Sequence, residues 1–164
     1  MNHLRKLKKE DAPLMLEWMH DPEVADNFRV DFGSVTMEQA EEFIKNSFTD
    51  RNQHFAIMDE NDSYVGTISL KNIDTTAGEA EYAIVTRRAS QGKGYAHLAT
   101  EELIGYAFDT LKLNRVYLNV LKENQKANHF YRKNGFEFLG EDPEKLLIKG
   151  KEHTLNLYEI RKKH

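Results

Sequence analysis

The 164-residue sequence predicts one mixed α/β (α+β) domain, in which helices cover a single sheet. Three observations support this fold class. Short strand patterns separated by polar loops fill the middle of the chain. The second half then alternates strand, helix, strand, helix and strand. Helical periodicity with recognisable start signals accounts for most of the remaining sequence.

The N-terminal part combines a short strand with two helices. Residues 3–7 are the candidate first strand. Apolar side chains recur at helical spacing over 11–19, which predicts the first helix. The polar segment after it is predicted as a loop that can hold a short turn of helix. Thr36 and Gln39 then form a capping-box pattern, which opens a second helix running to about Phe48.

Strand patterns dominate the middle and the end of the chain. The sequence ENDS between the first two of these strands is typical of a hairpin loop. Together with residues 3–7, they make seven predicted strands in all. The other six are 54–59, 64–72, 78–85, 115–121, 136–141 and 154–160.

Two further helices are predicted in the second half. The first, over 95–111, carries one apolar stripe. The second begins after Asn124, a good N-cap residue, and ends near Asn134. Gly135 follows as a suitable residue for leaving the helix. The residues of the apolar stripe are Ala96, Ala99, Leu103, Ile104, Ala107, Phe108 and Leu111.

Composition narrows the class of protein. The formal net charge is −4 and 40% of the residues are apolar, which allows one sizeable core and disfavours a dedicated nucleic-acid binder. The chain has no cysteine, so disulfides, thiolate zinc sites and a cysteine nucleophile are excluded. No segment has the apolar run of a signal peptide or a membrane span. We therefore expect a single cytoplasmic domain over 1–164 that binds neither nucleic acid nor membranes.

Two glycines at the start of a helix raise the question of what approaches the backbone there. Gly92 and Gly94 lie in RRASQGKGYA, directly before the helix over 95–111. A helix start offers unpaired N–H groups and the positive end of the helix dipole, which favour anions. A P-loop motif is absent, and His97 stands where a dinucleotide fingerprint needs its third glycine. On the glycines alone, a phosphate cradle and an ordinary strand-to-helix turn both remain open.

Two motifs together carry a family resemblance. The first is Q-x-x-G-x-A at Gln91, Gly94 and Ala96, directly after a predicted strand. The second, beyond the next strand, is NQKANHFYRKNGF over 124–136, which has the pattern N-x-x-A-x-x-x-Y-x-x-x-G-F. With both motifs in this order, the chain resembles the GNAT superfamily of N-acetyltransferases. Within that superfamily it looks like the branch that contains ribosomal-protein N-terminal, polyamine and amino-sugar acetyltransferases.

The resemblance implies a fold and a co-substrate. The fold is a central, mostly antiparallel seven-stranded sheet flanked by about four helices, with a splay between strands 4 and 5. Acetyl-CoA would bind with its pantetheine arm in the splay and its pyrophosphate on the glycine segment, and no metal is expected. The coenzyme-binding residues implied are Ile84, Val85, Thr86, Gln91, Gly92, Lys93, Gly94, Tyr95, Ala96 and Asn124.

The resemblance also implies catalytic roles. Tyr131 matches a family tyrosine that acts as general acid near the sulfur, although its helical pattern alone indicates a core residue. Glu81 is the candidate base, directly or through water, and the alternative is a charged residue on a solvent-facing strand. Asn119 stands where some relatives carry a glutamate, which leaves a water chain as another route for the proton. The backbone N–H of Ile84 or Val85 is the implied oxyanion donor.

The expected function is acetyl transfer to a primary amine of a polyamine, an amino sugar or a protein or peptide N-terminus, by direct attack in a ternary complex. The alternative is a non-catalytic coenzyme A-binding sensor or assembly module. The resemblance is also compatible with a homodimer. Seven acids against one base, Arg29, between residues 21 and 42 favour a cationic acceptor, unless they only solvate the surface. These acids are Asp21, Glu23, Asp26, Asp31, Glu38, Glu41 and Glu42.

Overall fold

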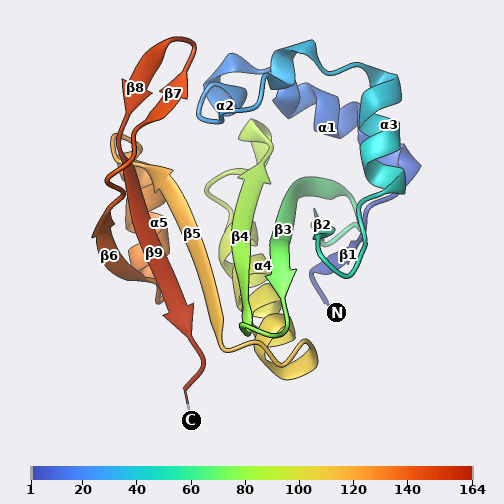
Figure 1. The fold of residues 1–164 in the computed structure, drawn as a ribbon. Coiled ribbons are helices and arrows are strands. Elements are labelled where there is room, and N and C mark those ends of the chain that lie inside the picture. The colour runs from blue at the N-terminus through green and yellow to red at the C-terminus, as the bar shows by residue number, and fades with distance from the viewer. Residues whose placement is uncertain (1, 164) are drawn as a thin grey trace.

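The computed structural model describes residues 2–163, which form a seven-stranded sheet with helices at both faces (Figure 1). The strand order is β1-β2-β3-β4-β5-β9-β6, and every neighbouring pair is antiparallel except β4 and β5. All seven predicted strands are confirmed. Their bounds are β1 (Leu4–Lys6), β2 (Gln53–Met58), β3 (Tyr64–Asp74), β4 (Glu79–Thr86), β5 (Arg115–Leu121), β6 (Glu137–Glu141) and β9 (Leu155–Arg161).

A small hairpin, which the sequence did not predict, stands at one end of the sheet beside α2 (Figure 1). Its strands are β7 (Leu146–Ile148) and β8 (Lys151–His153). Lys149 and Gly150 form the turn with φ of 52° and 79°, as a two-residue type I′ hairpin requires.

The helices largely follow their predicted starts. They are α1 (Ala12–Met19), α2 (Pro22–Ala25), α3 (Met37–Lys45), α4 (Tyr95–Gly105) and α5 (Gln125–Lys133). The capping box at α3 is confirmed, because Thr36 and Gln39 exchange side-chain bonds with each other's backbone N–H. The helix itself ends earlier than expected. The helix predicted over 95–111 is also wrong in its last turn, because residues Tyr106–Thr110 form a π-helical turn and not an α-helical one.

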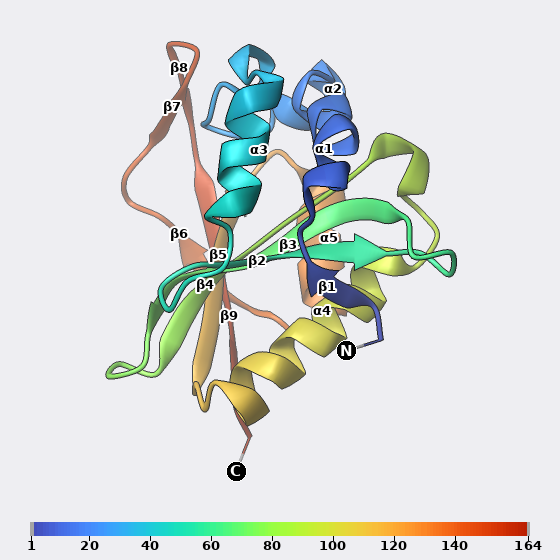
Figure 2. The ribbon, with the colours of Figure 1, turned by 90° about the vertical axis from the view of Figure 1, so that its right-hand side faces the viewer.

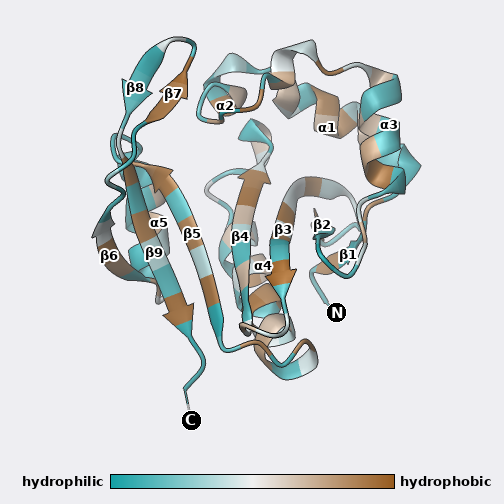
Figure 3. Ribbon diagram, viewed as in Figure 1, coloured by the Kyte–Doolittle hydropathy of each residue, from teal (hydrophilic) through white to brown (hydrophobic). Residues whose placement is uncertain are grey.

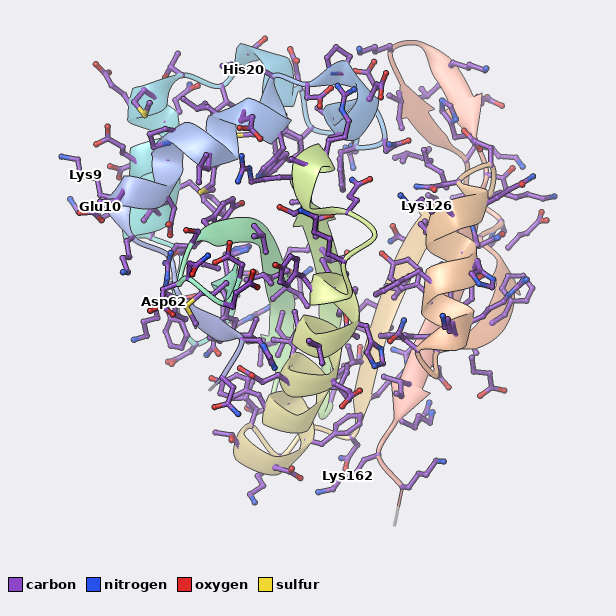
Figure 4. All side chains as sticks on the ribbon, turned by 180° about the vertical axis from the view of Figure 1, so that it is seen from behind. Lys9, Glu10, His20, Asp62, Lys126 and Lys162 are labelled. Carbon is purple, nitrogen blue, oxygen red and sulfur yellow. The ribbon has the colours of Figure 1, made fainter. Side chains whose placement is uncertain are left out.

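Two layers of helices enclose the sheet on opposite faces. Figure 2 shows α4 on one side and α1 to α3 on the other, and Figure 4 shows α4 and α5 together on the same face. The larger core lies between the sheet and α4 and α5, and a second core joins α1 and α3 to β2 and β3. Hydrophobic and hydrophilic residues alternate along β5 and β9, which separates the two faces (Figure 3). No helix within residues 2–163 is long and apolar enough to cross a membrane.

Candidate active site at the splay between β4 and β5

The central opening of the sheet lies between its two parallel strands. β4 and β5 pair only from Glu79 with Arg115 to Glu81 with Tyr117. Beyond that point β4 continues to Thr86 and β5 to Leu121 without pairing to each other. The strands therefore part into a V whose closed end lies at the Glu81–Tyr117 pair. Such a gap leaves one edge of β4 without hydrogen-bond partners from β5.

The pairing of β4 with β3 determines which backbone groups point into this V. The Arg87 N–H donates to the Val65 carbonyl at 2.9 Å. In an antiparallel ladder the N–H and C=O groups of alternate residues point toward the partner strand, so the backbone groups of Val85 point toward Thr67 on β3. Ile84 and Thr86 consequently present their N–H and C=O groups to the splay. Of the two candidate oxyanion donors, the alternation directs the amide of Ile84, and not that of Val85, into the gap.

Gly66 holds β3 unusually close to the open part of β4. A Cβ at this position would lie 2.4 Å from the Val85 carbonyl oxygen and 2.9 Å from the Thr86 Cα. Any side chain would therefore push the edge of β4 out of place. The sequence reasoning missed this residue, although a single glycine inside a strand pattern is a known sign of close backbone approach.

The glycine segment forms an open bend at the start of α4. Gly92 and Gly94 have φ of 78° and 85°, a left-handed conformation that side-chain-bearing residues rarely adopt. Leu98 makes the first backbone bond of the helix, to Gly94, and the N–H groups from Gly92 to His97 have no acceptor within residues 2–163. A Cβ on either glycine would meet nothing within 4 Å. The bend thus offers unpaired donors and unfilled space, which fit a diphosphate.

The two arginines that precede the bend are neutralised by carboxylates of the protein itself. Arg87 binds Glu17 through two hydrogen bonds of 2.8 and 3.0 Å. Arg88 binds Asp21 in the same way at 2.9 and 2.7 Å, and its remaining nitrogen lies 3.0 Å from Glu23. The acidic partners belong to α1, α2 and the residue that caps α2. These ion pairs join the helices on one face of the sheet to the strand end that leads into the bend.

Tyr131 lies in the aromatic cluster on the face of the sheet that α4 and α5 cover. Its ring contacts Tyr82 of β4 and Tyr158 of β9, with centroid distances of 5.9 and 6.0 Å. The hydroxyls of the buried residues Tyr64, Tyr82 and Tyr158 are all hydrogen-bonded. The Tyr131 hydroxyl has no such partner in the described chain, and burial alone raises its pKa. A protonated, unpaired phenol in the core is a candidate proton donor.

Asn124 caps α5 as predicted, because its side chain accepts a bond from the Ala127 N–H at 3.1 Å. The buried Asn128 then holds the start of this helix in place. Its amide nitrogen donates to the carbonyls of Leu121 and Asn124 at 3.0 and 2.7 Å. Its oxygen accepts from Asn156 and Tyr158 of β9. The helix that carries Tyr131 is therefore anchored to both strands beneath it.

Glu81 projects from the face of the sheet opposite Tyr131, because neighbouring residues of a strand alternate between faces. Its carboxylate accepts a hydrogen bond of 3.2 Å from the Asn72 amide and lies 3.5 Å from the Lys71 ammonium. Tyr117, its register partner on β5, has a pKa raised by burial and by the nearby Glu81 and Glu79 charges. Asn119 follows on the same face and is exposed. The two candidate catalytic side chains thus approach the splay from opposite faces.

Several carboxylates of the acidic segment between residues 21 and 42 are ion-paired with basic residues of the chain. Four of its seven acids form ion pairs: Asp21 and Glu23 with Arg88, Asp26 with Lys149, and Glu41 with Lys9. Three basic residues from elsewhere in the chain, Arg88, Lys149 and Lys9, therefore compensate half of its excess of negative charge, and its charge alone is weak evidence for a cationic acceptor. The described residues contain no group of side chains arranged to hold a metal ion.

Comparison with known proteins agrees with this geometry. The sequence profile of the acetyltransferase (GNAT) domain matches residues 3–137. The chain is 30% identical to spermidine N(1)-acetyltransferase of Escherichia coli (strain K12) over 157 residues, which cover 90% of this chain and 78% of that protein. It is 31% identical to the Vibrio cholerae spermidine N(1)-acetyltransferase over 114 residues, or 70% of this chain and 66% of that one.

The similarity extends to the three-dimensional structure. The crystal structure of spermidine N-acetyltransferase from Vibrio cholerae in complex with CoA and spermine superposes with a TM-score of 0.87 at 25% identity. The superposition covers 96% of this chain and 94% of the other.

Proposed function

Because the chain belongs to the GNAT acetyltransferase family, and so is an acetyl-CoA-dependent N-acetyltransferase, we propose that the amine it acetylates is a primary amine of a small polyamine. The observation that supports the coenzyme site is the V between β4 and β5, together with the unpaired N–H groups of the bend that follows β4. Acetyl-CoA supplies the activated acetyl group as its thioester. The free edge of β4 suits the amides of a pantetheine arm, and the bend suits a diphosphate.

The residues of the splay divide the chemistry between the two faces of the sheet. The Ile84 N–H donates to the thioester carbonyl oxygen and stabilises the negative charge that develops there. When the new C–N bond forms and the C–S bond breaks, the Tyr131 hydroxyl donates a proton toward the departing sulfur. Burial keeps this phenol protonated at neutral pH, because it raises the pKa of Tyr131 above its usual value.

Glu81 receives the proton that the attacking amine must lose, directly or through a water molecule. Its position supports this role, because it lies at the closed end of the V on the face opposite Tyr131. The amine then attacks from the face that carries Glu81, while the sulfur is protonated by Tyr131 from the face that α4 and α5 cover. The acid and the base therefore act from opposite faces of the sheet.

The polyamine acceptor is supported by two relatives named as spermidine N(1)-acetyltransferases and by the superposition on a spermine complex. The carboxylates around Tyr117 on the Glu81 face add little to this, because Glu79, Glu81 and Glu159 are paired with Arg115, Lys71 and Arg161. Amino sugars and peptide N-termini are the competing acceptors. They would have to use the same opening.

A thiol-release assay tests the proposal. Purified protein would be given acetyl-CoA with spermidine, spermine, glucosamine 6-phosphate or a peptide with a free N-terminus. Release with a polyamine at the highest kcat/KM supports the proposal, and a preference for the sugar or peptide overturns the acceptor assignment. Heat of CoA binding without release from any amine would indicate the non-catalytic module instead. The implied homodimer stays a prediction, which sedimentation equilibrium can test.

A further inference from the structure

Lys126 reaches across the splay from α5 to the bend. It lies in the first turn of α5 and is exposed, and Figure 4 labels it at the end of that helix nearest the start of α4. Its ammonium donates to the side-chain oxygen of Gln91 at 3.1 Å. Gln91 begins the bend whose unpaired N–H groups fit a diphosphate. A cation from a second helix therefore already stands at this opening.

The charge of Lys126 is not compensated by the protein. Arg87 and Arg88, which precede the bend in the chain, each bind carboxylates, whereas Lys93 lies within the bend and is exposed. Lys126 meets only the neutral amide of Gln91, and within residues 2–163 no carboxylate lies within ion-pairing distance of its nitrogen. The nearby Glu123 binds His153 instead, at 2.5 Å.

The position of Lys126 in its helix is also unfavourable for α5 itself. The N-terminal end of a helix carries the positive end of the dipole, so a cation in the first turn is repelled. The other basic residues of α5, Arg132 and Lys133, lie in the last turn, where the dipole favours them. The stability of the helix thus gives no reason for a lysine at 126, and an anion at the bend would.

We propose that Lys126 is a further coenzyme-binding residue, which binds the diphosphate of acetyl-CoA from α5, opposite the bend. This rests on the proposed function, because it assumes that the bend holds the coenzyme. On binding, the ammonium exchanges the Gln91 oxygen for phosphate oxygens, and the resulting hydrogen bond is charge-assisted on both sides. The diphosphate is then held between the backbone of one helix start and the side chain of another.

The test compares Lys126→Gln with Lys133→Gln, a matched loss of one exposed positive charge from the same helix. Calorimetry would measure the Kd of each variant and of the parent protein for CoA and for dephospho-CoA. Pantetheine, which has no phosphate, would be measured by competition. Because no acceptor is needed, these measurements do not depend on turnover. Thermal unfolding of the unliganded proteins completes the comparison.

For Lys126→Gln we expect CoA and dephospho-CoA to bind on the order of tenfold more weakly, and pantetheine to bind unchanged. Lys133→Gln should stay within about twofold of the parent for all three ligands. The Tm of Lys126→Gln should equal or exceed that of the parent, because an unfavourable charge has been removed from the start of α5.

Other outcomes would overturn the assignment. Equal losses for all three ligands, with a lower Tm, would mean that Lys126 only braces the bend through Gln91. A loss for CoA but not for dephospho-CoA would place the contact at the 3′-phosphate and not at the diphosphate. Unchanged CoA binding in Lys126→Gln would remove Lys126 from the site and leave the proposed function intact. A parent protein that binds no CoA would instead overturn the proposed function itself.

Discussion

The rings of Tyr82 and Tyr131 meet edge to face, with centroids 5.9 Å apart and planes at 89°. The Tyr82 hydroxyl is bonded to Thr100 at 2.7 Å, whereas the Tyr131 hydroxyl meets no hydrogen-bonding group in the part of the chain described. Two buried phenols in contact therefore differ in the hydrogen bonding of their hydroxyl groups. The Tyr82 hydroxyl is hydrogen-bonded within the core, and the Tyr131 hydroxyl is available to a molecule bound in the splay.

Removing that hydroxyl should separate catalysis from stability. In Tyr131→Phe we expect kcat to fall by about 10²-fold or more, because the leaving sulfur loses its proton donor. The Kd for acetyl-CoA and the Tm should change little. Tyr82→Phe is the matched control, and it should lose about 0.5–1.5 kcal/mol of stability with near-normal kcat. Steady-state kinetics and urea unfolding would measure both, and equal kcat values in the two variants would contradict the assignment.

Glu81→Gln should slow the reaction at neutral pH. The amide cannot accept the proton of the amine, so we expect kcat/KM at neutral pH to fall by about 10²-fold. Glu79→Gln, two residues away on the same face, should keep a kcat/KM close to that of the parent. If Glu81→Gln retains the parental kcat/KM, a water chain serves as base and Glu81 has no catalytic role.

The two glycines of α4 should respond in opposite directions to alanine. Gly94 has φ of 85°, so Gly94→Ala should lower stability by about 1 kcal/mol and weaken CoA binding by distorting the bend. Gly105 has φ of −59° and open space around it, so Gly105→Ala should raise stability by about 0.5–1 kcal/mol. Thermal unfolding and calorimetry test the pair. Stabilisation by Gly94→Ala would show that the left-handed conformation is not required.

Gly66→Ala should damage the coenzyme site from the neighbouring strand. The added methyl group would collide with the Val85 carbonyl and the Thr86 backbone, which lie 2.4 and 2.9 Å away. We expect a loss of about 1–3 kcal/mol in the free energy of unfolding and weaker CoA binding, because the free edge of β4 shifts. Urea unfolding and calorimetry would measure this. A variant with parental CoA affinity would mean that the edge of β4 does not bind the pantetheine arm.

His54 should make stability depend on pH between about 4 and 6.5. Burial, followed by the nearby Lys71 charge, lowers the pKa of His54 to about 4. The unfolded chain then binds more protons than the folded one, so stability is complete above pH 6.5 and falls as pH drops toward 4. The loss is at most about 3 kcal/mol. His54→Gln should flatten this slope in urea unfolding at several pH values, and an unchanged slope would assign it to other groups.

Local rules predicted much of the secondary structure, because the signals lie within a few residues of each other. The caps of α3 and α5 were predicted correctly, since both depend on side chains that bond to backbone groups one turn away. The π-helical turn at Tyr106–Thr110 was not, because its apolar stripe fits an ordinary helix equally well. The partial compensation of the acids between residues 21 and 42 could not be predicted either, because the cations Arg88 and Lys149 are distant in sequence.

By itself the sequence determined the seven strands, the glycine bend with its anion-favouring helix start, and the resemblance that implied acetyl-CoA. Only the tertiary structure decided which amides of β4 face the splay, since that depends on the register with β3. It also decided that, within residues 2–163, Tyr131 is the one buried tyrosine whose hydroxyl has no hydrogen-bond partner, and that Lys126 stands at the bend. The physical reason is the same in each case: local periodicity determines the face on which a group lies, and long-range packing determines what it meets there.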